Sequence, residues 1–407
     1  ASIVEEGTPK NIRMANLAVI GSHSVNGVSQ MHAQLLKDQL MPHFAEVFPD
    51  RFRGITNGVT PRRWLLQANP DLSSLLTKTI GDGWITDLSQ LKNLETYADD
   101  RGFCNDFADA KHAAKKRLSH WVMSELNIDI EPTALFDVQV KRIHEYKRQM
   151  LNLMHVGWLY GRMKEDPGFL PTPRVVIFSG KAAPGYERAK DVIKAINSMA
   201  DIINGDSSID GRLKVLYIPD YGVSLAEKII PAADLSEQIS LAGTEASGTG
   251  NMKFCLNGAL TIGTRDGANV EIAEEVGEEN MFLFGLRAEE VDASAPWYDP
   301  RWHIDHEPDT RQAVEFMFSE EVVWKDPAVF ERLRCMLFDE GDHWRHLNDF
   351  HGYRVAQDAA AEKFTHTDDW WRTAVLNVAR GGRFSSDRAI MEYAKTIWHS
   401  DPLPPVH

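Results

Sequence analysis

The chain has 407 residues, of which 43% are hydrophobic and 25% charged, and its formal net charge is −15. A chain of this length and apolar content can bury a large core and is expected to form two or three domains. Its acidic balance disfavours nucleic acid or an anionic membrane surface as a general partner. A site for an anion therefore has to be a local basic cluster.

The three cysteines, Cys104, Cys255 and Cys335, are scattered and show no metal-ligand spacing. This usage favours a reducing compartment and predicts neither a disulfide framework nor a metal site. No apolar run approaches the roughly 18 residues of a membrane span, and no charged-then-apolar leader opens the chain. We expect a cytoplasmic protein. Because the first residue is Ala1 and not Met, truncation or processing is also expected.

The first part of the chain alternates apolar turns with polar motifs, and residues 28–48 form an amphipathic run. Thr60 suits a helix N-cap and Pro61 a first helical position, which leaves Asn57 and Gly58 as the exposed turn before that helix. Residues 73–126 show mostly helical periodicity with many charges. The basic run at 111–117 is interpreted as a solvated helix face.

Apolar or β-branched runs then recur, mostly separated by helix-length stretches, at residues 136–140, 174–179, 213–218, 236–240, 260–264 and 281–285. This alternation predicts an α/β fold with a doubly wound parallel sheet. Ligands bind at the carboxyl ends of the strands in such sheets, which directs attention to the loops that follow each run. Residues 286–383 read as helical, Ser385 begins a final helix ending near Trp398, and the tail at 401–405 is expected to be loose.

The segment Glu245-Ala246-Ser247-Gly248-Thr249-Gly250-Asn251-Met252-Lys253 lies between the predicted strand at 236–240 and a helical run at 251–260. Its glycines would let a phosphate approach free amides at the helix start. Lys253, about one turn further on, could hold an aldehyde on the same molecule as a Schiff base, a combination that describes pyridoxal 5'-phosphate. The alternative is an ordinary glycine-containing loop between a strand and a helix, followed by a solvated lysine.

A basic loop follows the first strand and contains four cations in eight residues, Lys141, Arg142, Lys147 and Arg148. This loop is either a phosphate site or a basic helix start exposed to water. His144 in the same loop is either a proton carrier or a loop hydrogen-bonding residue.

Two further loops at the carboxyl ends of the strands contain side chains that could contact a ligand. Tyr221 follows the third strand and either stacks on a ring or packs, and Lys181 follows the second. The carboxylate, hydroxyl and amides of residues 245–248 suit sugar hydroxyls better than a nucleotide base. No Rossmann fingerprint with a downstream acid and no Walker lysine loop follows a strand, which leaves nucleotide binding weakly supported.

These motifs resemble the α-glucan phosphorylases, which include glycogen, starch and maltodextrin phosphorylase. The resemblance runs from residues 21–28 to 384–388, through long matching strings at 56–64, 136–149, 180–186, 230–240, 245–253 and 266–271. It implies a retaining glycosyltransferase that uses inorganic phosphate to release glucose 1-phosphate from non-reducing ends of an α-1,4-glucan. The implied fold is the Rossmann-like carboxyl-terminal lobe of a two-lobed GT-B enzyme.

The resemblance also implies roles for individual residues. Lys253 matches the pyridoxal phosphate lysine, and the cofactor phosphate is held by Lys141 with Gly248, Thr249 and Gly250, while Arg142 and Lys147 bind substrate phosphate. Contacts to the glucosyl unit are implied for Asn57, His144, Tyr146, Glu245, Ala246, Ser247 and Gly248. Contacts to the cofactor ring are implied for Trp64 and Tyr221. Some members carry a basic residue where this chain has Gly222.

Family members are about twice as long as this chain. By the resemblance, residues 1–54 are the remnant of an amino-terminal lobe, 55–384 the cofactor-binding lobe, and 385–407 a crossover helix and tail. The chain is then expected to be an incomplete, inactive half of an enzyme that dimerises through the missing lobe. Two alternatives are a catalytically silent module that binds cofactor or a partner, and a nucleotide-sugar glycosyltransferase lobe without pyridoxal phosphate.

Overall fold

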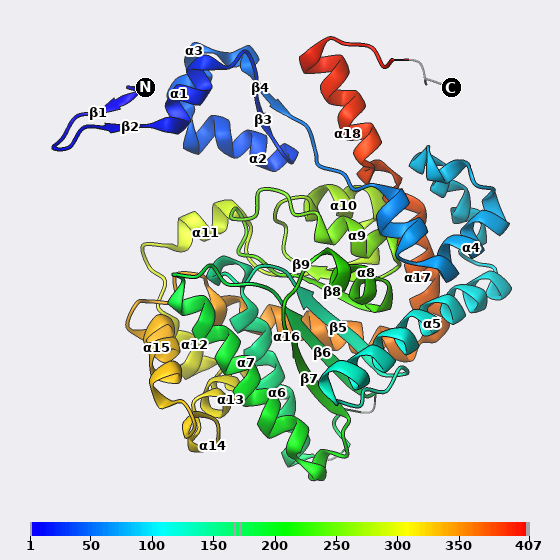
Figure 1. Cartoon of the computed structure of the whole chain (residues 1–407). Coiled ribbons are helices and arrows are strands. Elements are labelled where there is room, and N and C mark those ends of the chain that lie inside the picture. The colour runs from blue at the N-terminus through cyan, green and yellow to red at the C-terminus, as the bar shows by residue number, and fades with distance from the viewer. Residues whose placement is uncertain (1, 167, 171, 404–407) are drawn as a thin grey trace.

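A six-stranded parallel sheet forms the centre of the computed structural model, which describes residues 2–166, 168–170 and 172–403 (Figure 1). The strands follow the predicted runs to within two residues at each end: β5 (Leu135–Val140), β6 (Arg174–Ser179), β7 (Leu213–Ile218), β8 (Leu235–Gln238), β9 (Leu260–Gly263) and β10 (Phe282–Leu283). Both faces are covered, which explains why these strands read as nearly continuous apolar runs.

The strand order is β10-β9-β8-β5-β6-β7, with every neighbouring pair parallel. In chain order this is the doubly wound arrangement in which the first and fourth strands lie side by side and the connections depart in opposite directions. The topological switch point therefore lies between β5 and β8. Ligands in open α/β sheets bind in the crevice outside the strand ends at that point.

Helices pack on both faces of the sheet (Figure 1). One layer contains α6 (Gln149–Glu165), α7 (Glu187–Gly205), α13 (Pro308–Met317), α15 (Pro327–Phe338) and α16 (His346–Thr365). The other contains α5 (Arg101–Leu126), α8 (Val223–Ala232), α9 (Gly250–Leu256) and α17 (Thr367–Arg380). The remaining helices of this part are α10 (Asn269–Val276), α11 (Ala288–Ser294), α12 (Pro300–His306) and α14 (Glu320–Val323).

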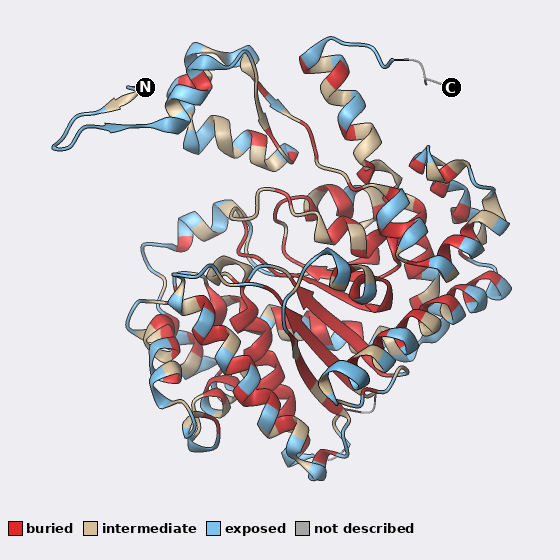
Figure 2. Cartoon of the chain, in the orientation of Figure 1, coloured by how far each residue is buried: buried red, intermediate tan, exposed pale blue. Residues whose placement is uncertain are grey.

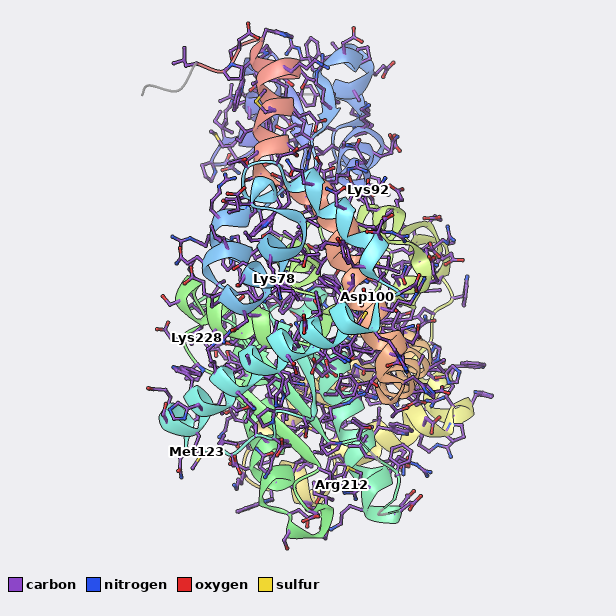
Figure 3. All side chains as sticks on the ribbon, turned by 90° about the vertical axis from the view of Figure 1, so that its right-hand side faces the viewer. Lys78, Lys92, Asp100, Met123, Arg212 and Lys228 are labelled. Carbon is purple, nitrogen blue, oxygen red and sulfur yellow. The ribbon has the colours of Figure 1, made fainter. Side chains whose placement is uncertain are left out.

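The helical region predicted at 73–126 consists of α4 (Pro70–Ile80), 3-10 helices at Gly83–Ile85 and Leu88–Tyr97, and α5. Figure 3 shows this face, with Lys78, Lys92 and Asp100 marking α4, the longer 3-10 helix and the start of α5. The predicted helix after Thr60 is a π-helix over Arg62–Gln67 with Pro61 at its N-cap, so the side chain of Thr60 does not cap it. Instead, the Thr60 carbonyl accepts from Trp64 N at 3.1 Å.

The first 54 residues stand apart from the main body, above it in Figure 1. They contain β1 (Val4–Glu5), β2 (Asn11–Ile12), α1 (Met14–Gly21), β3 (Val25–Gly27), α2 (Gln30–Leu35), a π-helix (Leu36–Leu40), α3 (Pro42–Val47) and β4 (Phe52–Gly54). The predicted amphipathic run at 28–48 is thus broken at Met41 and Pro42. Their small core contains Val19, Phe44 and Phe52 and is separate from the main core.

The chain enters and leaves the main body at one crossing. Val59 N donates to Phe384 O at 2.8 Å, and Ser386 N donates to Val59 O at 3.0 Å. Gly58 permits this approach, because a Cβ there would lie 2.2 Å from the Ser385 carbonyl oxygen. The final helix, α18 (Ser386–Tyr393) with a π-helical end at Ala394–Trp398, is capped by the Ser385 side chain as predicted. The predicted loose tail lies partly beyond the last described residue, since 404–407 are outside it.

The amino-terminal segment and α18 expose large apolar side chains that the main body does not cover (Figure 2). Met14 is 66% exposed, Leu40 63%, and Trp398 54%. Exposed apolar groups of this kind mark association surfaces. We therefore expect the 407-residue chain to self-associate and to be cleaved first near its ends, as gel filtration and limited proteolysis would show. A compact monomer that resists protease at both ends would contradict this expectation.

Candidate functional site

Lys141 lies directly after β5 at the switch point. Its Nζ donates to Gln238 Oε1, at the end of the adjacent strand β8, at 2.7 Å. Burial, together with the nearby charge of Lys147, lowers the pKa of Lys141 to about 8. The structure thus places a desolvated cation at the position where doubly wound sheets bind ligands.

Lys147 pairs with Glu245, which belongs to the loop after β8, and Tyr146 OH donates to the same carboxylate at 3.5 Å. Burial alone would lower the pKa of Lys147, but Glu245 and Tyr146 raise it overall. The ammonium group also lies 4.5 Å from the centre of the Tyr146 ring. Two loops that are about 100 residues apart in sequence therefore meet in one charged contact.

His144 lies between two aromatic rings, 4.7 Å from Tyr146 and 4.9 Å from Tyr186 between centroids. Burial is the main cause that lowers its pKa. Its backbone N–H donates to Gln149 Oε1 at 3.4 Å, and its Nδ1 finds no hydrogen-bond partner within the described part of the chain. Burial thus favours the neutral form of this imidazole.

The two arginines of the basic loop have opposite environments. Arg142 is exposed. Arg148 is fully buried in the left-handed backbone region, with φ 57°, and its Nη1 contacts Asp349 Oδ2 at 2.6 Å while its Nε donates to Ile239 O at 2.7 Å. Only three of the four predicted cations therefore remain for an anion, and Arg148 holds the loop to the core.

The loop at 241–249 is fixed by the buried carboxylate of Asp266. This carboxylate accepts from Gly243 N and Glu245 N, each at 2.9 Å, and from Ser240 Oγ at 2.7 Å. Ala246 O accepts from Ser29 Oγ at 2.6 Å, which joins the amino-terminal segment to this loop. Asp266 and Ser29 were not among the predicted site residues, although Asp266 falls within the matching string at 266–271.

The turn at 247–250 leads directly into α9. Ser247 O accepts from Ala268 N at 2.8 Å, Gly248 has a φ of +77°, and no side chain caps α9 at Thr249. A glycine at 248 is favoured because other side chains rarely adopt this backbone conformation. The predicted helix at 251–260 ends earlier, at Leu256, since Gly258 turns the chain with a φ of +72° into β9.

Lys253 lies in α9 with its Nζ 3.9 Å from the ring centroid of the buried Trp64. Burial lowers the pKa of Lys253, and no carboxylate within residues 2–166, 168–170 and 172–403 pairs with it. Asn257 ties the two residues together by donating to Trp64 O and Lys253 O, each at 2.8 Å. The arrangement presents a half-buried amine against an aromatic ring.

The other predicted residues lie in flanking loops. Tyr221 is half-buried in the loop between β7 and α8, and burial raises its pKa to about 12. Asn57 lies in the linker, where its carbonyl accepts from Arg388 Nη2 at 3.0 Å. Lys181 pairs with Asp220 at the exposed edge of the sheet.

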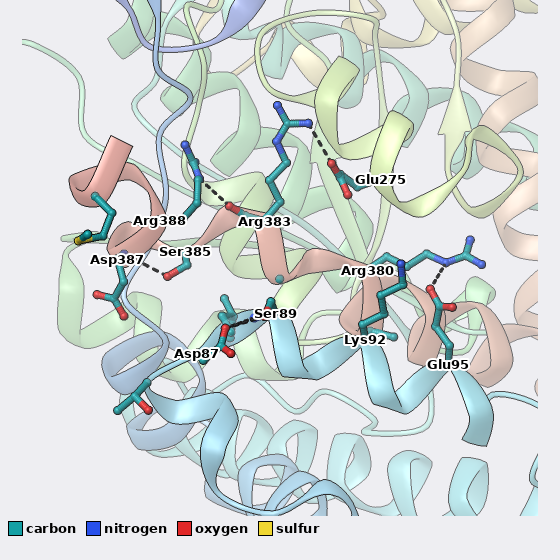
Figure 4. Close-up of a pocket in the computed structure, with 15 residues that line it drawn as sticks. Asp87, Ser89, Lys92, Glu95, Glu275, Arg380, Arg383, Ser385, Asp387 and Arg388 are labelled. Atoms are coloured by element: carbon teal, nitrogen blue, oxygen red, sulfur yellow. Dashed lines mark hydrogen bonds and ion pairs between the residues drawn. The ribbon is translucent and has the colours of Figure 1, made fainter. Parts of the chain in front are cut away.

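A cavity of about 520 Å³ lies elsewhere, between the 3-10 helix Leu88–Tyr97 and the turn before α18 (Figure 4). Its arginines are already paired, Arg380 with Glu95 and Arg383 with Glu275, each at 2.9 Å. No group of three or more metal-ligating side chains occurs among the described residues. In the same part of the chain, no helix is long and apolar enough to cross a membrane.

The fold and site define an α/β protein of the GT-B glycosyltransferase type, with lysines and a glycine turn at the switch point. Residues 1–400 match the family model described as carbohydrate phosphorylase, and the chain belongs to this family. It is 49% identical to a glycogen phosphorylase of Synechocystis sp., 50% to that of Chlamydia pneumoniae, and 48% to the mouse brain form. These matches cover 98–99% of this chain but only 47–48% of each relative, so the chain spans about half their length.

Proposed function

We propose that the chain supplies the cofactor-holding half of an α-1,4-glucan phosphorylase, which releases glucose 1-phosphate from non-reducing ends with inorganic phosphate. The observation that carries this proposal is the half-buried, unpaired amine of Lys253 against Trp64, in the helix that follows the switch-point strand β8. The names of the relatives support the same reaction.

The residues in and beside the loops after β5, β7 and β8 would suit pyridoxal 5'-phosphate. Lys253, whose pKa is lowered by burial, can anchor an aldehyde, while Trp64 and Tyr221 offer aromatic faces to its ring. Lys141 and the amides of Gly248, Thr249 and Gly250 would hold its phosphate. When bound, the cofactor supplies a phosphate that exchanges a proton with the substrate phosphate.

The residues around this place would bind substrate. Arg142 and Lys147 would hold inorganic phosphate, so the entering anion competes with Glu245 for the Lys147 ammonium group. Once displaced, Glu245 can accept from sugar hydroxyls beside Asn57, Tyr146, His144 and the turn at Ala246, Ser247 and Gly248. The crowded cations stabilise negative charge and the helix amides add to their effect. No pair of carboxylates is needed to flank the bond, in contrast to glycoside hydrolysis.

The proposed division of the chain follows its contacts. Residues 1–54 would belong to an amino-terminal lobe, 55–384 form the cofactor lobe, and 385–407 return toward the first lobe, as the bond from Asn26 Nδ2 to Tyr393 OH at 2.7 Å supports. We propose that a homodimer forms through the amino-terminal lobe and that the protein acts in the cytoplasm. A single lobe cannot exclude water or orient a glucan, so the 407-residue chain should not turn over.

Intact mass spectrometry after borohydride reduction tests the proposal. We expect a pyridoxyl phosphate adduct at Lys253 after incubation with the cofactor, and no phosphate release from glucose 1-phosphate with a maltooligosaccharide primer. The absence of an adduct on a folded chain would exclude the cofactor-holding role. Turnover by the chain alone would show that the second lobe is not required.

Cofactor binding should depend on pH through Lys141. Its pKa in the free chain lies at about 8, and the charged form is the one that attracts phosphate. The ammonium group is therefore present below pH 8 and lost above it, so the dissociation constant of pyridoxal phosphate should rise up to about tenfold per pH unit above 8. Fluorescence titration between pH 7 and 9.5 checks this. In Lys141→Met the rise should be smaller, and an equal rise would assign the dependence to another group.

A further inference from the structure

We propose that Gln238 is a positioning residue that directs the Lys141 ammonium group toward a phosphate at the switch point without neutralising it, and that Ser236 holds the Gln238 side chain in place. The inference rests on the proposed function for the identity of the anion. The hydrogen bonds that carry it are properties of the chain itself.

The contacts form a chain of three side chains. Lys141 Nζ donates to Gln238 Oε1 at 2.7 Å, and Gln238 Nε2 donates to Ser236 Oγ at 2.9 Å. Ser236 and Gln238 are two residues apart in β8 and therefore share one face of the strand. Both are buried, with exposures of 0% and 6%. Reversing the amide would point its NH2 group at the ammonium and break the bond to Lys141.

The backbone of Gln238 is held as firmly as its side chain. Its carbonyl accepts from Asn269 Nδ2 at 3.0 Å and from Thr264 N at 3.2 Å. Gly263 lies opposite it on β9, and a Cβ at 263 would approach the Gln238 carbonyl oxygen to 2.7 Å. The backbone that carries the acceptor for Lys141 is thus fixed between β8 and β9.

A neutral acceptor matters because of the charges nearby. Lys147 is already paired with Glu245, whereas no carboxylate of the described residues forms an ion pair with Lys141. Glu245, Glu237 and Asp266 favour the charged form of Lys141 from further away. The neighbouring carboxylate, Glu237, faces the other side of β8, where Tyr353 OH and Gln357 Nε2 donate to it at 2.8 and 2.6 Å. The amide occupies one of three ammonium donors, so two N–H groups and the full charge remain for an anion.

Replacing the amide with a carboxylate tests this role with little change of shape. In Gln238→Glu, Lys141 should form an ion pair, and its acetylation at pH 8 by acetic anhydride should fall at least tenfold relative to the exposed Lys78 (Figure 3). Gln238→Met, which cannot accept strongly, should not show this protection. Peptide mapping across pH 6–10 on folded, cofactor-free chain gives both results. Equal titration of Lys141 in Gln238→Glu and the unchanged chain would overturn the proposal.

The effect on the anion is measured separately. In the chain loaded with pyridoxal phosphate, Gln238→Glu should weaken cofactor binding at least tenfold and shift the pH titration of its phosphorus-31 resonance. Ser236→Ala should weaken binding less, and Ser236→Thr, which restores a hydroxyl, should recover it. Unchanged affinity in both Gln238→Glu and Ser236→Ala would also overturn the proposal. If the chain without substitutions binds no cofactor, while Gln238→Glu still protects Lys141 from acetylation, the proposed function is refuted and the role of Gln238 is not.

Discussion

Lys253→Ala should abolish anchored cofactor. The amine at 253 is the group proposed to hold the aldehyde, and its half-buried position against Trp64 keeps it available for that bond. After gel filtration with pyridoxal phosphate, the variant should show neither the visible absorbance of bound cofactor nor a reduced adduct. In a complete enzyme that includes this chain, phosphorolysis should be lost with it.

Lys181→Ala is the matched control for this change. Lys181 lies at the same edge of the sheet, but it is exposed and pairs with Asp220. The control should retain a full adduct at Lys253. If Lys253→Ala kept its cofactor, or if the adduct mapped to Lys181 in the unchanged chain, the assignment of the anchoring lysine would be wrong.

Arg148→Met should destabilise the fold by about 3–5 kcal/mol, the usual cost of leaving one partner of a buried ion pair uncompensated. Asp349 would lose its contact at 2.6 Å, and Ile239 O would lose the donor that ties the end of β8 to the basic loop. Urea unfolding followed by circular dichroism measures the change.

Arg142→Met provides the contrast within the same loop. Arg142 is exposed, so its free energy of unfolding should change by no more than about 0.5 kcal/mol. Its proposed contact with inorganic phosphate should nevertheless be lost, which a complete enzyme would show as a higher KM for phosphate. Equal destabilisation by the two substitutions would contradict the different environments of the two arginines.

The sheet could be predicted closely from the sequence because strands that are buried on both faces leave nearly continuous apolar runs. The edge that carries the site followed from the rule for ligands in parallel sheets. Local periodicity described the helices less well. Residues 62–67 adopt a π-helix, and residues 88–97 a 3-10 helix, because packing against distant elements determines how each turn closes.

Side-chain direction was the main feature that the sequence could not supply. Arg148 and Arg142 look alike in the basic loop, yet the left-handed backbone at 148 turns the first of them into the core. Ser236 and Gln238 were not predicted as site residues, although the sequence pointed to them: polar side chains in a strand predicted to be buried need hydrogen-bond partners. Lys141, the partner of Gln238, lies about 100 residues earlier, and the pairing of β5 with β8 brings the two together.

The crossing at Val59 and Ser385 brings the first and last residues of the main body next to each other. The two ends of the segment between these residues are hydrogen-bonded to each other, so the main body begins and ends at the same place. Domain insertion and circular permutation are tolerated where chain ends lie this close. Residues 59–385 should therefore be transplantable as one piece, and a rotation of this body relative to the amino-terminal segment would have to break the bond from Ser29 Oγ to Ala246 O.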